Sequence, residues 1–210
     1  MKKVQPQKFI NISTIRIFSE LNQNPISSSS VPRPLTPYGI SKVTAENYFN
    51  ALFHKSATKV TNIRLGSVSS YGEVPTQLFS QLFNSTFKKK KITINKGHIS
   101  NVLYIDEAID LIISSVLGGE KDNYLIVGEA NLNENISRRF EEISERKLNA
   151  EFIDLNPGEI DPVFISDRDK LKAEWTRSYS LDSMIKLIIK THLKNSADLD
   201  TMVQRNSFNM

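Results

Sequence analysis

The order of the first elements constrains the fold most strongly. Two β-rich runs, "KFINIST" at 8–14 and "ATKVTNIRL" at 57–65, flank a segment of helical character that begins "PYGISK". A Ser/Pro-rich loop precedes this helix, and Thr36 followed by Pro37 is typical of a helix N-terminus. The sequence therefore predicts a parallel βαβ unit with a right-handed crossover.

The rest of the chain continues the alternation of helices and strands. We expect strands near 92–94, 101–105, 123–128 and 150–155, and helices near 76–88, 106–117, 134–146, 167–174 and 180–194. The helix at 106–117 has apolar residues at helical spacing, and we expect these to face the core: Ile105, Ile109, Ile112, Ile113 and Val116. Residues 196–210 lack a periodic pattern, so we expect a loose tail.

Composition is that of a globular protein with few special site chemistries. Of the 210 residues, 39% are hydrophobic and 24% charged, which allows one sizeable core, or one core and a small lobe. The absence of cysteine excludes disulfides, thiolate metal sites and thiol nucleophiles. The three histidines are not at ligand spacing, so we predict no metal site.

The net charge of +4 comes partly from the run 88–91, four lysines that we interpret as a solvated turn. We therefore expect neither a nucleic-acid partner nor a membrane partner. No apolar run reaches the roughly 18 residues of a membrane span, and the N-terminus has no signal-peptide pattern. These features predict a cytoplasmic protein.

One pair of residues has the spacing of an acid/base device. Tyr38 and Lys42 stand at i and i+4 on the predicted helix, so both point from one face. An ammonium held near a phenol favours the phenolate, which suits a phenol to proton transfer near neutral pH. The same spacing is common on ordinary helix surfaces, and the pair alone does not decide between the two interpretations. The hydroxyls of Ser13 and Thr14, at the end of the first strand, could complete such a device at the carboxyl edge of a parallel sheet.

Together these segments resemble the extended short-chain dehydrogenase/reductases, the NAD-dependent epimerase/dehydratase group that acts on nucleotide-linked sugars. "FINISTIRIF" looks like the family's strand ending in Ser-Ser/Thr, and "PYGISKVTAE" is similar to its Pro-Tyr-x-x-Ser-Lys-x-x-x-Glu motif. Downstream, "IRLGSVSSYGE", "SNVLYIDEAIDLI" and "SDRDKLKAEWTRSYSLDSMIKLII" are similar to later family segments. The resemblance runs from about residue 8 to 194.

The resemblance implies a role for each matching residue. Tyr38 would be the general acid/base at a sugar carbon, while a hydride passes to or from the nicotinamide of NAD or NADP. Lys42 would hold the nicotinamide ribose, and Thr14 would orient the sugar oxygen, with Ser13 beside it. The cofactor would also contact Ser13, Leu65, Gly66 and Val68. Ser67 and Ser100 would contact the substrate.

Two departures from the family pattern bear on the reaction. Ser67 stands where many members have asparagine, and Ser100 stands where several have a diphosphate-binding arginine, whose charged fork a serine lacks. The dehydratase subgroup places Asp-Glu after the catalytic Ser/Thr, whereas Ile15 and Arg16 follow Thr14 here. We therefore favour a sugar-nucleotide epimerase or 4-keto reductase, serving polysaccharide biosynthesis or another glycosylated product, over a 4,6-dehydratase.

The largest departure is the absence of the glycine-rich turn that approaches the pyrophosphate of a dinucleotide. No three of the eight glycines, at 39, 66, 72, 97, 118, 119, 128 and 158, form such a turn. The chain is therefore expected to be a fragment or truncated form, a natural half completed by a complementing N-terminal half, or a degenerate remnant. The remnant would be a non-catalytic binding or regulatory module, which is the alternative function.

The predicted fold class is α/β: the C-terminal portion of a Rossmann-like, doubly wound parallel sheet plus a small α/β substrate-binding lobe. We expect the remaining Rossmann part at 1–66, and the lobe, interleaved with the last Rossmann elements, at 67–195. The resemblance further implies a homodimer and a nucleotide-linked sugar as substrate.

Overall fold

The chain forms two compact units that interleave in sequence. The computed structural model describes residues 6–70, 77–118, 120–154 and 161–207, with side chains described as far as residue 194. The first unit comprises Met1–Val68, Ile99–Ala130 and Pro157–Ser178, and the second comprises Ser69–His98, Asn131–Asn156 and Tyr179–Met210.

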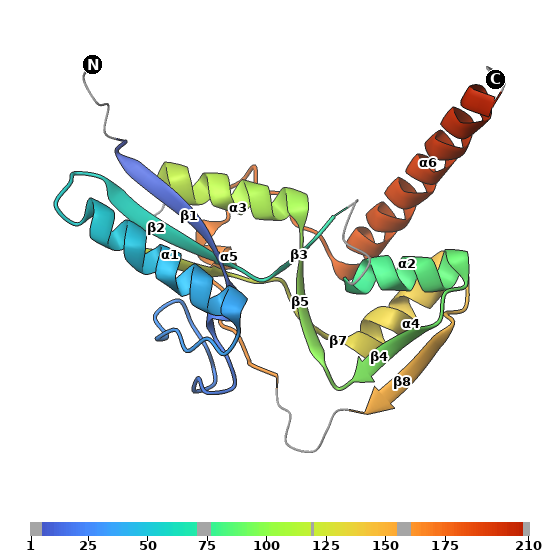
Figure 1. The fold of residues 1–210 in the computed structure, drawn as a ribbon, viewed down its shortest axis with the longest axis horizontal. Helices are drawn as coiled ribbons and strands as arrows, with labels where there is room; N and C mark the ends of the chain where they lie inside the picture. Colours follow the sequence, from blue (N-terminus) through green and yellow to red (C-terminus); the bar gives the residue numbers. More distant parts are fainter. Residues whose placement is uncertain (1–5, 71–76, 119, 155–160, 208–210) are drawn as a thin grey trace. The chain divides into compact units, whose positions relative to one another are not determined.

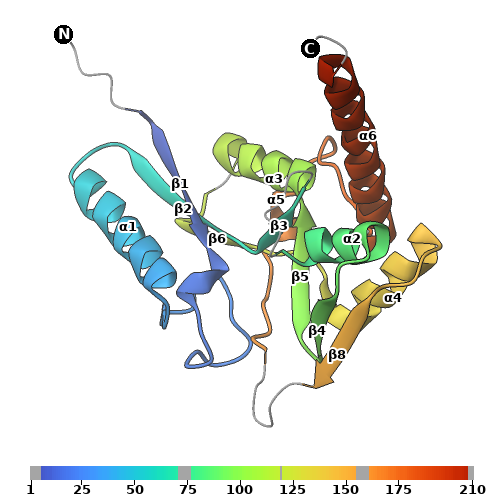
Figure 2. The same cartoon turned by 45° about the vertical axis from the view of Figure 1, so that its right-hand side comes forward.

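The first unit is built on a parallel three-stranded sheet of order β1-β2-β6. Figure 1 labels β1 and β2, and Figure 2 also labels β6. β1 (Lys8–Thr14) pairs with β2 (Lys59–Leu65) over its whole length, and β2 pairs with β6 (Asn123–Ile126). Parallel β1 and β2, with a helix between them, confirm the predicted α/β class.

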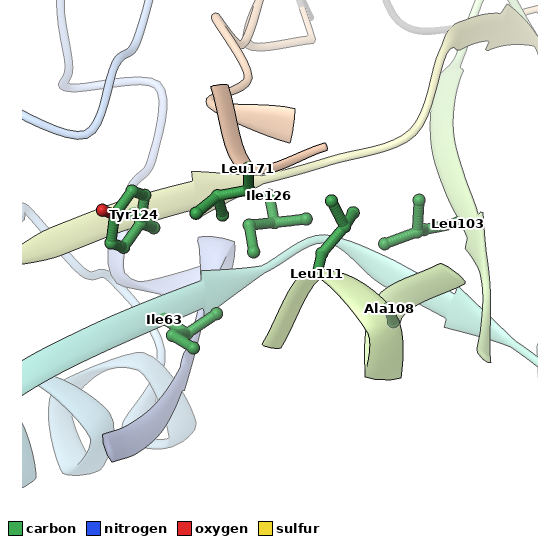
Figure 3. Close-up of a cluster of buried hydrophobic side chains, with 7 residues drawn as sticks. All are labelled: Ile63, Leu103, Ala108, Leu111, Tyr124, Ile126 and Leu171. Atoms are coloured by element: carbon green, nitrogen blue, oxygen red, sulfur yellow. The ribbon is translucent and has the colours of Figure 1, made fainter. Parts of the chain in front are cut away.

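Helices α1 and α3 lie on opposite faces of this sheet (Figure 2). On one face, Phe9 of β1 packs against Phe49 and Phe53 of α1 (Pro37–Phe53), with ring centroids 4.5 and 5.2 Å apart. On the other face, α3 (Ile105–Gly118) contributes to a buried cluster. The members of this cluster are Ile63, Leu103, Ala108, Leu111, Tyr124, Ile126 and Leu171 (Figure 3).

The apolar face predicted for α3 is not its buried face. Ile109, Ile113 and Val116 are 42–45% exposed, and Ile105 and Ile112 are only half-buried. The side turned inward carries small and polar residues as well as Leu111: Glu107, Ala108, Asp110, Ser114 and Ser115. The prediction was wrong because Glu107 and Asp110 are buried through ion pairs with arginines from 161–178, which periodicity does not reveal.

Short elements complete the first unit. A 3-10 turn, η1 (Ile15–Ile17), follows β1, and α5 (Arg168–Leu171) packs beside α3. A second buried cluster lies on the α1 face and comprises Ile17, Phe18, Ile26, Leu125 and Val127. Among the described residues, the chain passes between the units within β3 (Ser67–Ser69), at the start of β5 (Ile99–Tyr104), within β7 (Ala130–Leu132) and between Ser178 and Tyr179.

The second unit is a small α/β lobe. β4 (Ile92–Lys96) and β8 (Ala150–Asp154) form a parallel pair, with α2 (Leu78–Lys88), α4 (Asn133–Ser144) and α6 (Leu181–Ser207) around them. Its buried side chains are mainly large and apolar: Phe79, Leu82, Phe83, Ile94, Ile136, Phe140, Ile185 and Ile188. Lys88 is the last residue of α2 and Lys89 follows in the left-handed conformation, so the exposed lysine run lies where the helix ends and the chain turns.

The main differences from the predicted elements are at their ends. α5 is shorter than the helix expected at 167–174, and α6 continues through 196–207, where a loose tail was expected. The predicted helix at 76–88, strand at 150–155 and tail at 196–210 include positions that lie outside the described residues, namely 76, 155 and 208–210. In the part of the chain searched, no helix is both long and apolar enough to cross a membrane.

Candidate active site

The N-terminus of α1 fixes the position of the Tyr38–Lys42 pair. Thr36 is the N-cap, and its hydroxyl accepts a hydrogen bond from the Gly39 N–H at 3.1 Å. Pro37 occupies the first turn, where its missing N–H costs nothing. Tyr38 therefore stands in the first turn of the helix, with Lys42 one turn further on.

Gly39 lets this helix end approach the chain that follows β1. A Cβ placed on Gly39 would lie 2.2 Å from the Arg16 carbonyl oxygen and 2.9 Å from Cβ of Pro34. Both distances are below any normal contact, and the oxygen belongs to the backbone of η1. Only glycine fits here, and the close approach brings α1 next to the C-terminal end of β1.

Tyr38 and Lys42 lie together at this end of the sheet. The Lys42 ammonium is 5.8 Å from the centroid of the Tyr38 ring, and its Nζ donates to the Ile12 carbonyl oxygen at 3.2 Å. Tyr38 is 52% exposed, so its phenol is open to a bound molecule. The pair is thus anchored to β1 through the lysine, with the tyrosine accessible.

The two hydroxyls at the end of β1 are buried. The Thr14 hydroxyl accepts from the Arg16 N–H at 3.3 Å and caps η1. The Ser13 hydroxyl has no hydrogen-bond partner within the described part of the chain, although the residue is only 3% exposed. A buried hydroxyl without a partner is costly, and a ligand or water at the strand end would satisfy it.

Three residues at and after the end of β2 are expected to contact the cofactor: Leu65, Gly66 and Val68. Thr14 is in register with Leu65, so Gly66 follows directly at the same end of the sheet. Leu65 and Val68 pack against the cluster of Figure 3, so both side chains contribute to the core. Gly66 donates to the Ile126 carbonyl at 2.8 Å, which holds this turn against β6.

Two serines, Ser67 and Ser100, are expected to contact the substrate. Ser67 is exposed, as a substrate contact requires. Ser100 precedes Asn101, whose carbonyl oxygen is 3.3 Å from the position of a Cβ on Gly66. The structure thus brings five of the predicted site residues to the same end of the sheet: Ser13, Thr14, Tyr38, Lys42 and Gly66. Ser100 directly precedes Asn101, the residue that contacts Gly66.

Sequence reasoning missed a buried ion pair that begins at Glu46, one helical turn after Lys42. Arg64 of β2 donates to both carboxylate oxygens of Glu46, from Nε at 3.2 Å and from Nη2 at 2.9 Å. The side chains are 5% and 4% exposed, respectively. Arg64 also donates from Nη1 to the Ser28 carbonyl at 2.9 Å and lies 5.4 Å from the Phe18 ring centroid. The available signal was Glu46, one turn after Lys42 on the same helix face.

This arrangement suits proton transfer. An exposed phenol beside an ammonium, with buried hydroxyls at the neighbouring strand end, can exchange a proton with an oxygen of a bound molecule. Among the described residues, no three His, Cys, Asp or Glu side chains are grouped so that they could hold a metal ion.

A family model described as the NAD dependent epimerase/dehydratase family matches residues 1–124, more than half of the chain. The chain belongs to this family. A related sequence from Bacillus subtilis (strain 168), described as an uncharacterized UDP-glucose epimerase, is 28% identical over 160 residues, 73% of this chain.

Solved structures of similar fold include sugar-nucleotide enzymes. The UDP-glucuronic acid 4-epimerase of Bacillus cereus, in complex with UDP-glucuronic acid and NAD, gives a TM-score of 0.75 at 22% identity over 90% of this chain. The UDP-glucose 4-epimerase of Thermotoga maritima, with UDP-glucose, gives 0.77 at 19% identity, also over 90%. At these identities the likeness shows the fold.

The chain spans only part of these relatives. It covers 50% of the Bacillus subtilis sequence, 62% of the Bacillus cereus chain and 64% of the Thermotoga maritima chain.

Proposed function

We propose that this chain carries the acid/base and substrate-side part of an NAD(P)-dependent sugar-nucleotide epimerase or 4-keto reductase. In this proposal it acts in the cytoplasm on a nucleotide-linked sugar, in polysaccharide biosynthesis or a related glycosylation. The single observation that carries the proposal is the exposed Tyr38 phenol held 5.8 Å from the Lys42 ammonium beside the end of β1.

The residues present fit the nicotinamide end of a dinucleotide. Lys42 Nζ donates one hydrogen bond, to Ile12, among the described residues, and an ammonium has three N–H donors. Two donors thus remain for ribose hydroxyls. The buried Ser13 hydroxyl lacks a partner in the same part of the chain and is suited to a polar group of the cofactor or substrate. When bound, the cofactor supplies the hydride acceptor and donor.

The roles of the protein residues follow from their chemistry. Tyr38 Oη exchanges a proton with the hydroxyl or keto oxygen of the sugar, and the Lys42 ammonium lies beside the phenol ring. Thr14 orients the same oxygen. Ser67 and Ser100 contact the substrate. Leu65, Gly66 and Val68 would contact the nicotinamide.

The domain assignment forms part of this proposal. Residues 1–66 belong to the Rossmann portion, and the lobe within 67–195 binds the substrate. The division of the chain after Val68 and the small α/β second unit support this assignment.

The decisive variant is Tyr38→Phe, which keeps the ring and removes the proton donor. A complete N-terminal Rossmann half is fused to this chain, and NADH binding is followed by fluorescence and turnover of UDP-glucose by product analysis. We expect turnover to fall by about 10² or more, with NADH affinity nearly unchanged. Tyr48→Phe is the matched control, since Tyr48 is on the same helix and 60% exposed. Unchanged turnover in Tyr38→Phe would refute the assigned role.

A non-catalytic remnant is the second candidate. Serine at positions 67 and 100, in place of the family's asparagine and arginine, favours it. Failure of the fused protein to bind NADH would support this alternative and exclude the enzyme. An in-frame strand and glycine motif in the DNA before Met1 would favour the enzyme.

A further inference from the structure

An exposed arginine lies in the turn that follows β1. Arg16 is the middle residue of η1, and its backbone N–H donates to the Thr14 hydroxyl at 3.3 Å. Its carbonyl oxygen would lie 2.2 Å from a Cβ on Gly39, so α1 begins directly against it. The backbone of Arg16 is thus held between Thr14 and the first turn of α1, which carries Tyr38.

The Arg16 guanidinium takes no part in holding the fold together. Within the described ranges, its side chain has neither a hydrogen bond nor an ion pair. Two other arginines of the first unit differ in this respect, since Arg64 pairs with Glu46 and Arg177 pairs with Asp110. A guanidinium has five N–H donors. Those of Arg16 are available to a bound molecule.

The charge at this end of the sheet is positive. Lys42, the other cation beside Tyr38, donates to the Ile12 carbonyl and pairs with no carboxylate in the described part of the chain. Glu20 is the acidic residue nearest to Arg16 in the sequence, and it is exposed and forms no ion pair there. Two cations without a counter-charge favour the binding of an anionic group.

The place of Arg16 decides which anionic group of a nucleotide-linked sugar it meets. Under the proposed function, Tyr38 and Thr14 hold the reacting oxygen of the sugar. In a 4-keto reductase this oxygen is on C4, and C4 is opposite C1, which carries the diphosphate. The C6 group is attached to C5, the neighbour of C4. The Arg16 side chain begins between Tyr38 and Thr14, so C6 is the position within its reach.

We propose that Arg16 binds a carboxylate on the sugar, and that the site accepts a nucleotide-linked uronic acid. The guanidinium donates two parallel hydrogen bonds to the two oxygens of the C6 carboxylate, a geometry that suits arginine better than lysine. Tyr38 and Thr14 hold the neighbouring oxygen on C4. This inference rests on the proposed function, because that function places the sugar beside Tyr38. Arg16 then determines specificity and takes no part in proton transfer.

The diphosphate is the other source of an anionic group in such a substrate. An arginine that bound the diphosphate would strengthen the binding of acidic and neutral sugars equally, because both carry this group. UDP-glucuronic acid and UDP-glucose differ only at C6, where one has a carboxylate and the other a hydroxymethyl group. The comparison of these two probes therefore separates the two sources.

Binding is measured by isothermal titration calorimetry on the whole 210-residue chain. We expect UDP-glucuronic acid to bind more tightly than UDP-glucose by about tenfold or more, because hydrogen bonds between charged groups are stronger than neutral ones. Equal affinities for the two probes would overturn the proposal, and so would the absence of binding by UDP-glucuronic acid.

Two substitutions of Arg16 test the role of its charge. Arg16→Gln should abolish the preference and leave the affinity for UDP-glucose unchanged, and Arg16→Glu should reverse the preference. Both variants should fold, because the side chain holds no hydrogen bond or ion pair in the described structure. Lys55→Gln is the matched control: it makes the same change in charge at an exposed residue beyond the other end of α1, and should keep the preference.

Two results with these variants contradict the proposal. One is a preference for UDP-glucuronic acid that survives Arg16→Gln. The other is an equal loss of affinity for both probes in Arg16→Gln, which would assign Arg16 to the diphosphate.

The binding test is separate from the test of the proposed function, since it needs neither a cofactor nor turnover. If the preference is present but Tyr38→Phe leaves turnover unchanged, the role of Arg16 stands and that of Tyr38 fails. If the fused protein turns over UDP-glucose but the chain has no preference for UDP-glucuronic acid, the role of Arg16 alone fails.

Discussion

The buried pair of Glu46 and Arg64 gives the sharpest test of how α1 is held on the sheet. Glu46→Gln preserves the shape of the side chain but leaves the Arg64 guanidinium without its counter-charge. The two side chains are 4% and 5% exposed, so water compensates little for the loss. Breaking a buried pair by removing one partner costs about 3–5 kcal/mol, a large share of the roughly 5–15 kcal/mol that stabilises a typical domain.

Replacing both residues together should lower the free energy of unfolding much less than Glu46→Gln does. In Glu46→Leu with Arg64→Met, the pair is exchanged for apolar contact of similar volume, which is often neutral in stability. The hydrogen bond from Arg64 to the Ser28 carbonyl is also lost, and such a bond contributes about 1 kcal/mol. We therefore expect the double variant to be destabilised by about 1 kcal/mol, well below Glu46→Gln.

The assay is urea unfolding followed by fluorescence of Trp175, the single tryptophan, which lies in the first unit. Arg138→Gln is the control, because Arg138 forms an exposed i,i+4 pair with Glu142 on α4 and its loss should not shift the midpoint measurably. This reasoning is refuted if Glu46→Gln lowers the free energy of unfolding by less than about 1 kcal/mol. It is also refuted if the double variant is as unstable as Glu46→Gln.

Two further predictions concern the first unit. Arg177 holds the pKa of Asp110 at about 2, below its ordinary value of 3.8, mainly through side-chain hydrogen bonds. Because the folded-state pKa is lowered, this ion pair stabilises the protein above pH 4, and its contribution is lost as the pH falls through about 2. At pH 6, Asp110→Asn should lower the free energy of unfolding by about 1–2 kcal/mol, a value kept small because Arg177 is half exposed. In urea titrations, this difference from the parent protein should be smaller at pH 3. A difference that does not change between pH 6 and pH 3 would contradict the assignment. Gly39→Ala should displace α1 from Arg16, lower the unfolding midpoint and increase hydrogen exchange at the start of α1, whereas Ala51→Gly, at an exposed position, should leave that exchange unchanged.

The βαβ core was predictable because its signals are local. β-branched runs mark β1 and β2, and Thr36 with Pro37 marks the start of α1 where the structure has it. The proximity of Tyr38 and Lys42 follows from helical spacing alone. Three-residue strands such as β3 and β7 carry no periodic pattern and were not predicted.

The features that were missed depend on distant residues. Glu46 and Arg64 are 18 positions apart, and no local pattern shows that they pair. The orientation of α3 was wrong because periodicity locates an apolar face but not the side that neighbouring elements cover. Arg168 and Arg177 bury the acidic flank of α3, and this decides which flank stays open.

The contact between Gly39 and Arg16 has a consequence for how such a site can change over evolutionary time. The start of α1 rests on a backbone oxygen and is capped by Thr36, so the position of the Tyr38 ring does not depend on the side chains that would touch a sugar. Residues such as Ser67 and Ser100 can therefore vary with little effect on the placement of the phenol. Under the proposed function, specificity can diverge in such a site while the Tyr38 phenol stays in place.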